Sequence, residues 1–135
     1  MTEDCVFCKI ARGEELASRI FENEDVLAFL DARPANEGHT LVIPRRHYGN
    51  IFEVPDEELA RLFKIVKKVA AAVKKSQEAE GIRILQNNGK AANQIIFHFH
   101  VHIIPEYQRQ GVFRHRITAE LGDLERVAAK IREFI

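Results

Sequence analysis

Three histidines alternate with apolar residues in the segment 98–102, and this spacing is the clearest sign of chemistry in the chain. Side chains of a β-strand alternate between its two faces, so His98, His100 and His102 would project together from one face. Successive imidazoles would then stand about 7 Å apart. The opposite face would carry the apolar residues Phe97, Phe99, Val101 and Ile103. The segment is thus predicted to present a row of titratable groups in front of a packed layer.

Such a row of imidazoles has three interpretations. The histidines can be polar residues of a solvated strand face, or they can hold a catalytic metal ion, because alternating histidines are a familiar way to bind zinc. Alternatively, one imidazole nitrogen attacks phosphorus while its neighbours bind the phosphate oxygens and move protons. With an ordinary pKa of about 6.5, neutral histidine is a competent nucleophile near pH 7 without an additional base. The third interpretation is favoured.

Composition restricts the class of protein. The chain has 135 residues, of which 46% are apolar and 30% charged, and its formal net charge is zero. This length predicts a single domain over residues 1–135, and the charge balance argues against nucleic-acid or membrane partners. The acidic start Met1-Thr2-Glu3-Asp4 is unlike a signal peptide, and no apolar run is long enough for a bilayer. A cytoplasmic location is therefore expected.

The two cysteines, Cys5 and Cys8, are separated by two residues. In a reducing compartment this spacing indicates metal or redox chemistry rather than a structural disulfide. No βαβ pattern surrounds the pair, which makes the redox interpretation the weaker one.

Changes in hydrophobic period predict the elements that must position these groups. The expected strands are Arg19–Glu22, Val26–Leu30, His39–Pro44, Ile82–Gln86 and Ile95–Ile104, and the expected helices are Asp56–Glu80 and about Asp123–Phe134. Asp56 is expected to cap the long helix and Gly81 to end it. The last two strands would pair antiparallel. The fold class is therefore α+β, with a mainly antiparallel sheet of about five strands, one long helix and a C-terminal helix. Since one helix covers only one sheet face, a homodimer is expected.

Several segments in their order resemble the histidine triad (HIT) superfamily, and more closely its branch of histidine triad nucleotide-binding proteins. The segment Gln94-Ile95-Ile96-Phe97-His98-Phe99-His100-Val101-His102-Ile103-Ile104-Pro105 is similar to the signature of that family. The similarity extends to segments 5–10, 27–31, 38–44 and 87–89, so it covers nearly the whole chain. It implies a single HIT domain.

The resemblance implies a two-step displacement at phosphorus. His100 matches the histidine that attacks the α-phosphate of a nucleotide conjugate and becomes transiently nucleotidylated, after which water releases the nucleoside monophosphate. His102 would contact the phosphate, and His39 would help to set protonation in the site. The implied substrates are purine nucleoside phosphoramidates or dinucleoside polyphosphates. The alternative is a purine nucleotide-binding interaction module with weak or no catalysis.

The same resemblance implies the nucleotide contacts. Asp31 would hold the ribose hydroxyls, a task that suits a carboxylate accepting two hydrogen bonds. Asn87 would bind near the phosphate, and Gln94 would also belong to the nucleotide site. An apolar slot for the purine would be lined by Phe7, Ile10 and Phe29.

Two positions depart from the family pattern. The family usually has serine or threonine directly after the glutamine, where this chain has Ile95, and the lost hydroxyl puts the rate and the leaving-group preference in question. The glycine usually found before the glutamine is Asn93 here. A glycine position can require a positive φ, which asparagine tolerates better than other substitutes.

A structural zinc site is the expected cofactor site, with no organic cofactor. Two thiolates need two further ligands for tetrahedral zinc. Some members that resemble this chain combine the cysteine pair with a histidine after the third strand and with the first triad histidine. The matching set is Cys5, Cys8, His47 and His98.

Overall fold

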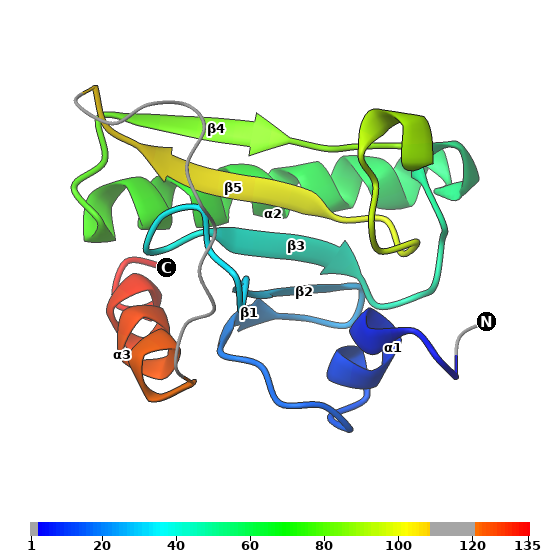
Figure 1. Cartoon of the computed structure of the whole chain (residues 1–135), viewed down its shortest axis with the longest axis horizontal. Helices are drawn as coiled ribbons and strands as arrows, with labels where there is room; N and C mark the ends of the chain where they lie inside the picture. Colours follow the sequence, from blue (N-terminus) through cyan, green and yellow to red (C-terminus); the bar gives the residue numbers. More distant parts are fainter. Residues whose placement is uncertain (1–2, 109–120) are drawn as a thin grey trace.

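The computed structural model describes residues 3–108 and 121–135. Five strands form one antiparallel sheet in the order β1-β2-β3-β5-β4, which confirms the predicted α+β class (Figure 1). The strands are β1 (Arg19–Glu22), β2 (Val26–Leu30), β3 (Thr40–Pro44), β4 (Gly81–Leu85) and β5 (Val101–Glu106). The helices are α1 (Val6–Ala11), α2 (Asp56–Ser76) and α3 (Leu121–Arg132), with short 3-10 turns η1 (Ile51–Glu53) and η2 (Lys90–Ala92).

The two faces of the sheet are covered by different helices. The larger apolar core lies under α2 and α3 and includes Val42, Val101 and Ile103 of the sheet. A smaller core lies on the opposite face, where Phe7 and Ile10 of α1 pack with apolar residues of β2 and β3. Every residue of β2 and β3 is consequently buried. Helix α1, which contributes this second layer, was not predicted from the sequence.

The long helix α2 forms because apolar residues recur every three or four positions. Leu62, Val66, Val69 and Val73 lie on its buried side. The helix begins after Pro55, which is the N-cap, so the prediction that Asp56 caps it is wrong. It ends at Ser76 rather than at residue 80, because Glu78 adopts a left-handed backbone with a φ of 51°.

The largest correction concerns the histidine strand. Strand β5 begins at Val101, so the first two histidines of the triad lie in an irregular segment before it. The backbone N–H of Phe99 donates to the Tyr48 carbonyl (2.6 Å) instead of entering the sheet. Phe99 is buried as predicted, whereas Phe97 is 52% exposed. The strand predicted from the alternating sequence, which began at Ile95, therefore starts too early in the chain.

In the described ranges 3–108 and 121–135, no helix has the length and apolar character that crossing a membrane requires. The sixth histidine of the chain, His115, lies outside those ranges.

Candidate functional site

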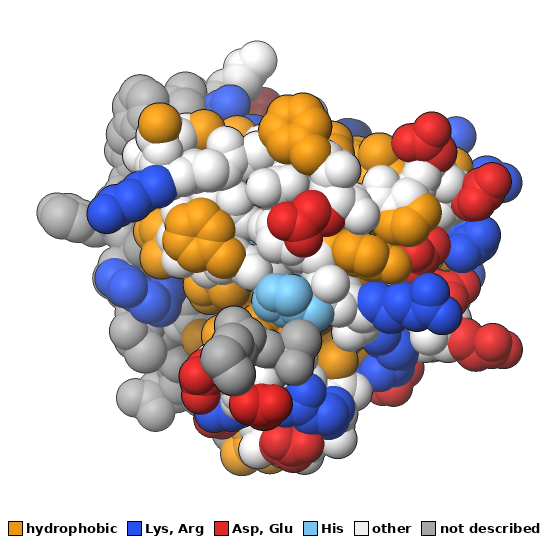
Figure 2. All heavy atoms as spheres, turned by 90° about the vertical axis from the view of Figure 1, so that its right-hand side faces the viewer, with side chains coloured by type: hydrophobic (Ala, Val, Ile, Leu, Met, Phe, Trp, Pro, Cys, Tyr) orange, Lys and Arg blue, Asp and Glu red, His pale blue; other side chains and the backbone are white. Residues whose placement is uncertain are grey.

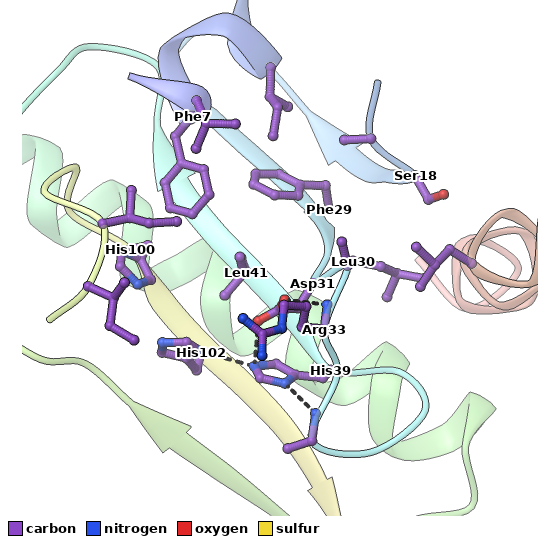
Figure 3. Close-up of a pocket in the computed structure, with 18 of the residues that line it drawn as sticks. Phe7, Ser18, Phe29, Leu30, Asp31, Arg33, His39, Leu41, His100 and His102 are labelled. Carbon is purple, nitrogen blue, oxygen red and sulfur yellow. Dashed lines mark hydrogen bonds and ion pairs between the residues drawn. The ribbon is translucent and has the colours of Figure 1, made fainter. Parts of the chain in front are cut away.

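A cavity of about 810 Å³ opens beside the last two histidines of the triad (Figure 3). It extends along α1, the end of β2, the loop that follows it, and the start of β5. Eight of the nine predicted catalytic and nucleotide-binding residues line it: Phe7, Ile10, Phe29, Asp31, His39, Asn87, His100 and His102. Residues far apart in the sequence thus meet around one space.

The hydrogen bond of His100 assigns its tautomer. His100 is buried, and its Nδ1 lies 2.7 Å from the backbone carbonyl oxygen of His98. A carbonyl oxygen only accepts, so Nδ1 carries the proton and Nε2 carries the lone pair. The ring of Phe7 packs edge-on against the imidazole, with centroids 5.2 Å apart. In its neutral form, His100 is therefore held in the tautomer whose Nε2 carries the nucleophilic lone pair.

A second chain of hydrogen bonds assigns the proton on His102. The backbone N–H of Ala35 donates to Nδ1 of His39 (3.0 Å), so the proton of His39 is on Nε2. That N–H is 2.9 Å from Nδ1 of His102 and 3.5 Å from a carboxylate oxygen of Asp31. Because His102 accepts at Nδ1, its own proton is on Nε2. His102 is thereby prepared as a hydrogen-bond donor.

The apolar part of the cavity lies on the face of the sheet that α1 covers. Phe7 and Phe29 contact each other edge-to-face with ring centroids 5.5 Å apart, and Ile10 packs in the same cluster. The rings of His100 and His102 follow, with centroids 4.9 Å apart rather than the predicted 7 Å. The apolar part of the cavity therefore adjoins the imidazoles.

The two cysteines and two further histidines form a separate cluster, and none of these four residues lines the cavity. The ligand atoms of Cys5, Cys8, His47 and His98 all lie within 4.8 Å of one another. The Nδ1 atom of His98 is 3.3 Å from Sγ of Cys5, and Nδ1 of His47 is 3.3 Å from Sγ of Cys8. Cys5 is also the N-cap of α1, and its sulfur accepts from the Cys8 N–H. The first turn of α1 thus presents both sulfurs to the two rings.

Burial shifts the pKa values of His98 and Cys8 toward the neutral form of each group. It lowers the pKa of His98 to about 4, while the hydrogen bond from Nε2 to the Pro44 carbonyl (2.8 Å) acts in the opposite direction. Burial also raises the pKa of Cys8 to about 11, and the neighbouring Cys5 adds to the rise. Since Nε2 of His98 donates to a carbonyl, its unprotonated Nδ1 faces the sulfurs. This arrangement of a ligating histidine with a carbonyl behind it is typical of metal sites.

The family model described as HIT domain matches residues 12–109. This chain belongs to the HIT family. Its structure is similar to the crystal structure of a HIT-like protein from Bartonella henselae, with a TM-score of 0.92 and 38% identity over 98% of this chain and 97% of that chain. It is also similar to a zinc-bound histidine triad family protein from Mycobacterium smegmatis, with a TM-score of 0.88 and 34% identity over 98% and 94% of the two chains.

Sequence relatives include HIT proteins of three kinds of organism. A HIT-like protein of Methanocaldococcus jannaschii is 44% identical over 128 residues, which are 95% of this chain and 98% of that protein. Adenylylsulfatase HINT3 of Arabidopsis thaliana is 40% identical over 109 residues, 81% of this chain and 55% of that protein. Adenosine 5'-monophosphoramidase HNT1 of Candida albicans is 38% identical over 106 residues, 76% of this chain and 70% of that protein.

In this HIT protein, Gln94 is the one predicted nucleotide-site residue outside the cavity lining. It is buried, accepts from the Gly89 N–H (2.7 Å) and donates to the carbonyls of Gly49 (2.6 Å) and Ile96 (3.1 Å). Gln94 therefore fixes the loop before the triad. Asn93, next to it, has a φ of 68°, the left-handed conformation that its place in the HIT pattern predicts.

Two further residues of this HIT protein, Ile95 and Arg33, line the cavity although the sequence did not predict this. Ile95 is 81% exposed and lines the cavity, so an apolar side chain stands where the family usually has a hydroxyl. Arg33 also lines the cavity, and its backbone N–H donates to Asp31 (2.8 Å). Figure 3 shows the Arg33 side chain beside Asp31 and His39. The only signal for Arg33 was its place in the turn after Asp31.

Proposed function

We propose that this protein is a nucleotide-binding hydrolase or transferase that acts on the α-phosphate of purine nucleotide conjugates through a nucleotidyl-His100 intermediate. The observation that carries the proposal is the 2.7 Å hydrogen bond from Nδ1 of His100 to the His98 carbonyl. It leaves the lone pair on Nε2, in the wall of a cavity large enough for a nucleotide. A neutral imidazole presented in this way is a nucleophile that needs no separate base.

The reaction consists of two displacements. In the first, Nε2 of His100 bonds to phosphorus, the bond to the leaving amine breaks, and the amine departs with the bonding pair and a proton from solvent. The positive charge that develops on the imidazole is stabilised by the His98 carbonyl at Nδ1. In the second, water bonds to phosphorus, the P–Nε2 bond breaks, and the proton returns to solvent. His102 donates from Nε2 to a phosphate oxygen in both steps.

The remaining cavity residues would bind the nucleotide. The purine packs against Phe7 and Phe29 in the apolar part of the cavity, where a flat ring fits without requiring hydrogen bonds. Asp31 accepts from the ribose hydroxyls, and Asn87 binds near the phosphate. The names of two relatives, an adenylylsulfatase and an adenosine 5'-monophosphoramidase, support a substrate with an adenylyl group.

Release of AMP from adenosine 5'-phosphoramidate tests this proposal. Intact-protein mass spectrometry of a quenched reaction should show an adduct with the mass of one AMP residue. His100→Ala should lower turnover by roughly three orders of magnitude, lose the adduct and keep its circular dichroism spectrum and its AMP affinity. Equal turnover in wild type and His100→Ala would refute the mechanism.

Zinc is the proposed cofactor, held by Cys5, Cys8, His47 and His98. Two sulfurs and two imidazole nitrogens within 4.8 Å of one another match the donor set of structural zinc. A zinc-bound neighbour among the solved structures supports this assignment. Bound zinc would stiffen the segment before β5, whose His98 carbonyl positions His100. Metal analysis of the purified protein should find one zinc ion per chain, and the Cys5→Ser/Cys8→Ser double variant should have none.

A homodimer is the proposed assembly. Strand β4 is an edge of the sheet, and its Ile84 and Leu85 are partly exposed. Phe52 and Phe97 are further exposed apolar side chains, and Figure 2 shows apolar side chains among polar and charged ones on the face at the right-hand side of Figure 1. A second copy would cover them. Light scattering should give twice the chain mass, and Ile84→Lys should give the mass of a single chain.

A second function, nucleotide binding with little chemistry, is favoured by one observation. Ile95 places an exposed apolar side chain in the cavity at the position where the family usually has a hydroxyl. This alternative predicts AMP binding by calorimetry together with no adduct and no AMP release. The mass-spectrometric experiment above therefore separates the two functions.

A further inference from the structure

One buried polar group in the cavity has no part in the mechanism above. Ser18 lines the cavity, is only 1% exposed, and its Oγ has no hydrogen-bond partner within residues 3–108 and 121–135. Among the buried side-chain nitrogen and oxygen atoms of those residues, it is the one without a partner. The backbone carbonyl of Ser18 accepts from the Leu30 N–H (3.0 Å), which fixes its position relative to β2.

Ser18 lies at the end of the cavity that is away from the two imidazoles. In Figure 3 it is drawn beyond Phe29 and Leu30, away from His100 and His102. Its neighbours along the lining are the apolar side chains of Ala17, Phe29 and Leu30. A hydroxyl in such surroundings loses its hydrogen bonds to water without gaining others, which is unfavourable until a partner arrives.

A bound purine supplies such a partner. If the phosphate is at His100 and the ring lies against Phe7 and Phe29, the six-membered ring is the part of the purine farthest from the phosphate. Its edge carries ring nitrogens and an amino or carbonyl group. A serine hydroxyl both donates and accepts, so it pairs with any of these atoms. An apolar slot alone discriminates weakly between rings of the same shape, whereas a buried hydroxyl rejects a ring that leaves it unpaired.

We propose that Ser18 is a specificity-determining residue, whose hydroxyl hydrogen-bonds to a heteroatom on the six-membered-ring edge of the bound purine. The proposal depends on the nucleotide orientation given under the proposed function. It adds a polar contact to a slot that otherwise recognises shape and apolar surface.

A pair of substrates of the same shape tests this contact. Adenosine 5'-phosphoramidate is compared with the benzimidazole riboside 5'-phosphoramidate, which keeps two fused rings but lacks the heteroatoms of the six-membered ring. In the wild type, kcat/KM should be about three- to tenfold higher for the adenine substrate. Ser18→Ala should lose that factor on adenine and leave the benzimidazole substrate unchanged.

A matched control is available in Ser76, which is also buried but donates to the Val73 carbonyl within α2. Ser76→Ala should keep the wild-type ratio between the two substrates. Ser18→Ala should also unfold at the same temperature as the wild type or a higher one, because it removes an unpaired hydroxyl. An equal loss on both substrates, or no loss on either, would overturn the role of Ser18.

Binding measurements separate this inference from the proposed catalysis. Calorimetric titration with AMP and with benzimidazole riboside monophosphate measures the preference for adenine as a ratio of two Kd values, independently of turnover. One possible result is that the wild type turns over neither substrate but binds AMP three- to tenfold more tightly than the analogue, and that Ser18→Ala abolishes this difference. The proposed catalytic function would then be refuted, whereas the Ser18 contact would be supported. If the Kd ratio is equal in wild type and Ser18→Ala, or neither nucleotide binds, the contact is refuted.

Discussion

Replacing His39 by phenylalanine tests the hydrogen bond that assigns the proton of His102. His39 is almost completely buried and its Nε2–H donates to Nδ1 of His102 over 2.9 Å. Phenylalanine has a ring of similar size but no N–H, so it removes the donor while largely filling the same volume. His102 then loses the contact that fixes its orientation and keeps its proton on Nε2, facing the phosphate.

The expected loss of kcat/KM follows from the weakened hydrogen bond between His102 and the phosphate. A hydrogen bond to a charged group is worth about 1.5–3 kcal/mol, and about 1.4 kcal/mol corresponds to a tenfold change in rate. We therefore expect His39→Phe to lower kcat/KM on adenosine 5'-phosphoramidate by about 10- to 150-fold. The Ala35 N–H also loses its acceptor, which should lower Tm by roughly 4 °C.

Steady-state kinetics with continuous detection of AMP is the assay, and His39→Gln is the matched variant. Glutamine keeps an N–H donor, so it should recover part of the lost rate. The adduct on His100 should still form in His39→Phe, because the nucleophile is held by the His98 carbonyl and not by His39. A kcat/KM within twofold of the wild type in His39→Phe would refute the role assigned to the pair.

Three further substitutions give separate outcomes. Phe29→Leu removes the edge-to-face partner of Phe7 and should raise KM for adenine substrates about three- to tenfold with little change in kcat, as measured by steady-state kinetics. Cys8→Ser should reduce zinc below one ion per ten chains and lower Tm by roughly 10 °C, with metal analysis and calorimetry as the measurements. Burial, followed by the charges of nearby carboxylates, raises the pKa of Tyr107, so its stabilising contribution is complete below about pH 10 and is lost as pH rises further. Urea unfolding between pH 9 and 11 should show a smaller loss of stability in Tyr107→Phe than in the wild type, because Cys8, whose pKa burial raises to about 11, contributes to the loss in both proteins.

The elements that the sequence predicted well are those with a long hydrophobic period. The stripe of α2 and the apolar runs of β2 and β3 led to elements whose bounds agree within a few residues. The short helix α1 has only six residues, too few for a period to emerge, and its N-cap is a cysteine rather than a usual capping residue. Helix α1 packs against β2 and β3, and no local sequence pattern predicts this tertiary contact.

The candidate site was predicted mainly through resemblance. His39 and His102 are 63 positions apart, and no spacing rule connects them. The alternation around His100 identified the face of the histidines but not the end of the strand, because the segment before Val101 is held by the carbonyls of Tyr48 and Pro44. Such long-range contacts decide where a strand starts and are absent from a local pattern. For the same reason Ser18 carried no signal, and Arg33 carried only its place in the turn after Asp31.

The irregular segment before β5 has a consequence that a continuous strand would not have. In a strand, the His98 carbonyl would be directed sideways toward a neighbouring strand, and its ring would point to the same face as that of His100. Here the ring of His98 faces the two cysteines while its carbonyl accepts from Nδ1 of His100. One residue thereby connects the metal cluster to the nucleophile. A change in the cluster is therefore expected to act on the attack by His100, whereas the His39–His102 pair, held by Ala35 and Asp31, should keep its geometry. Adduct formation and phosphate binding should consequently respond differently to zinc removal.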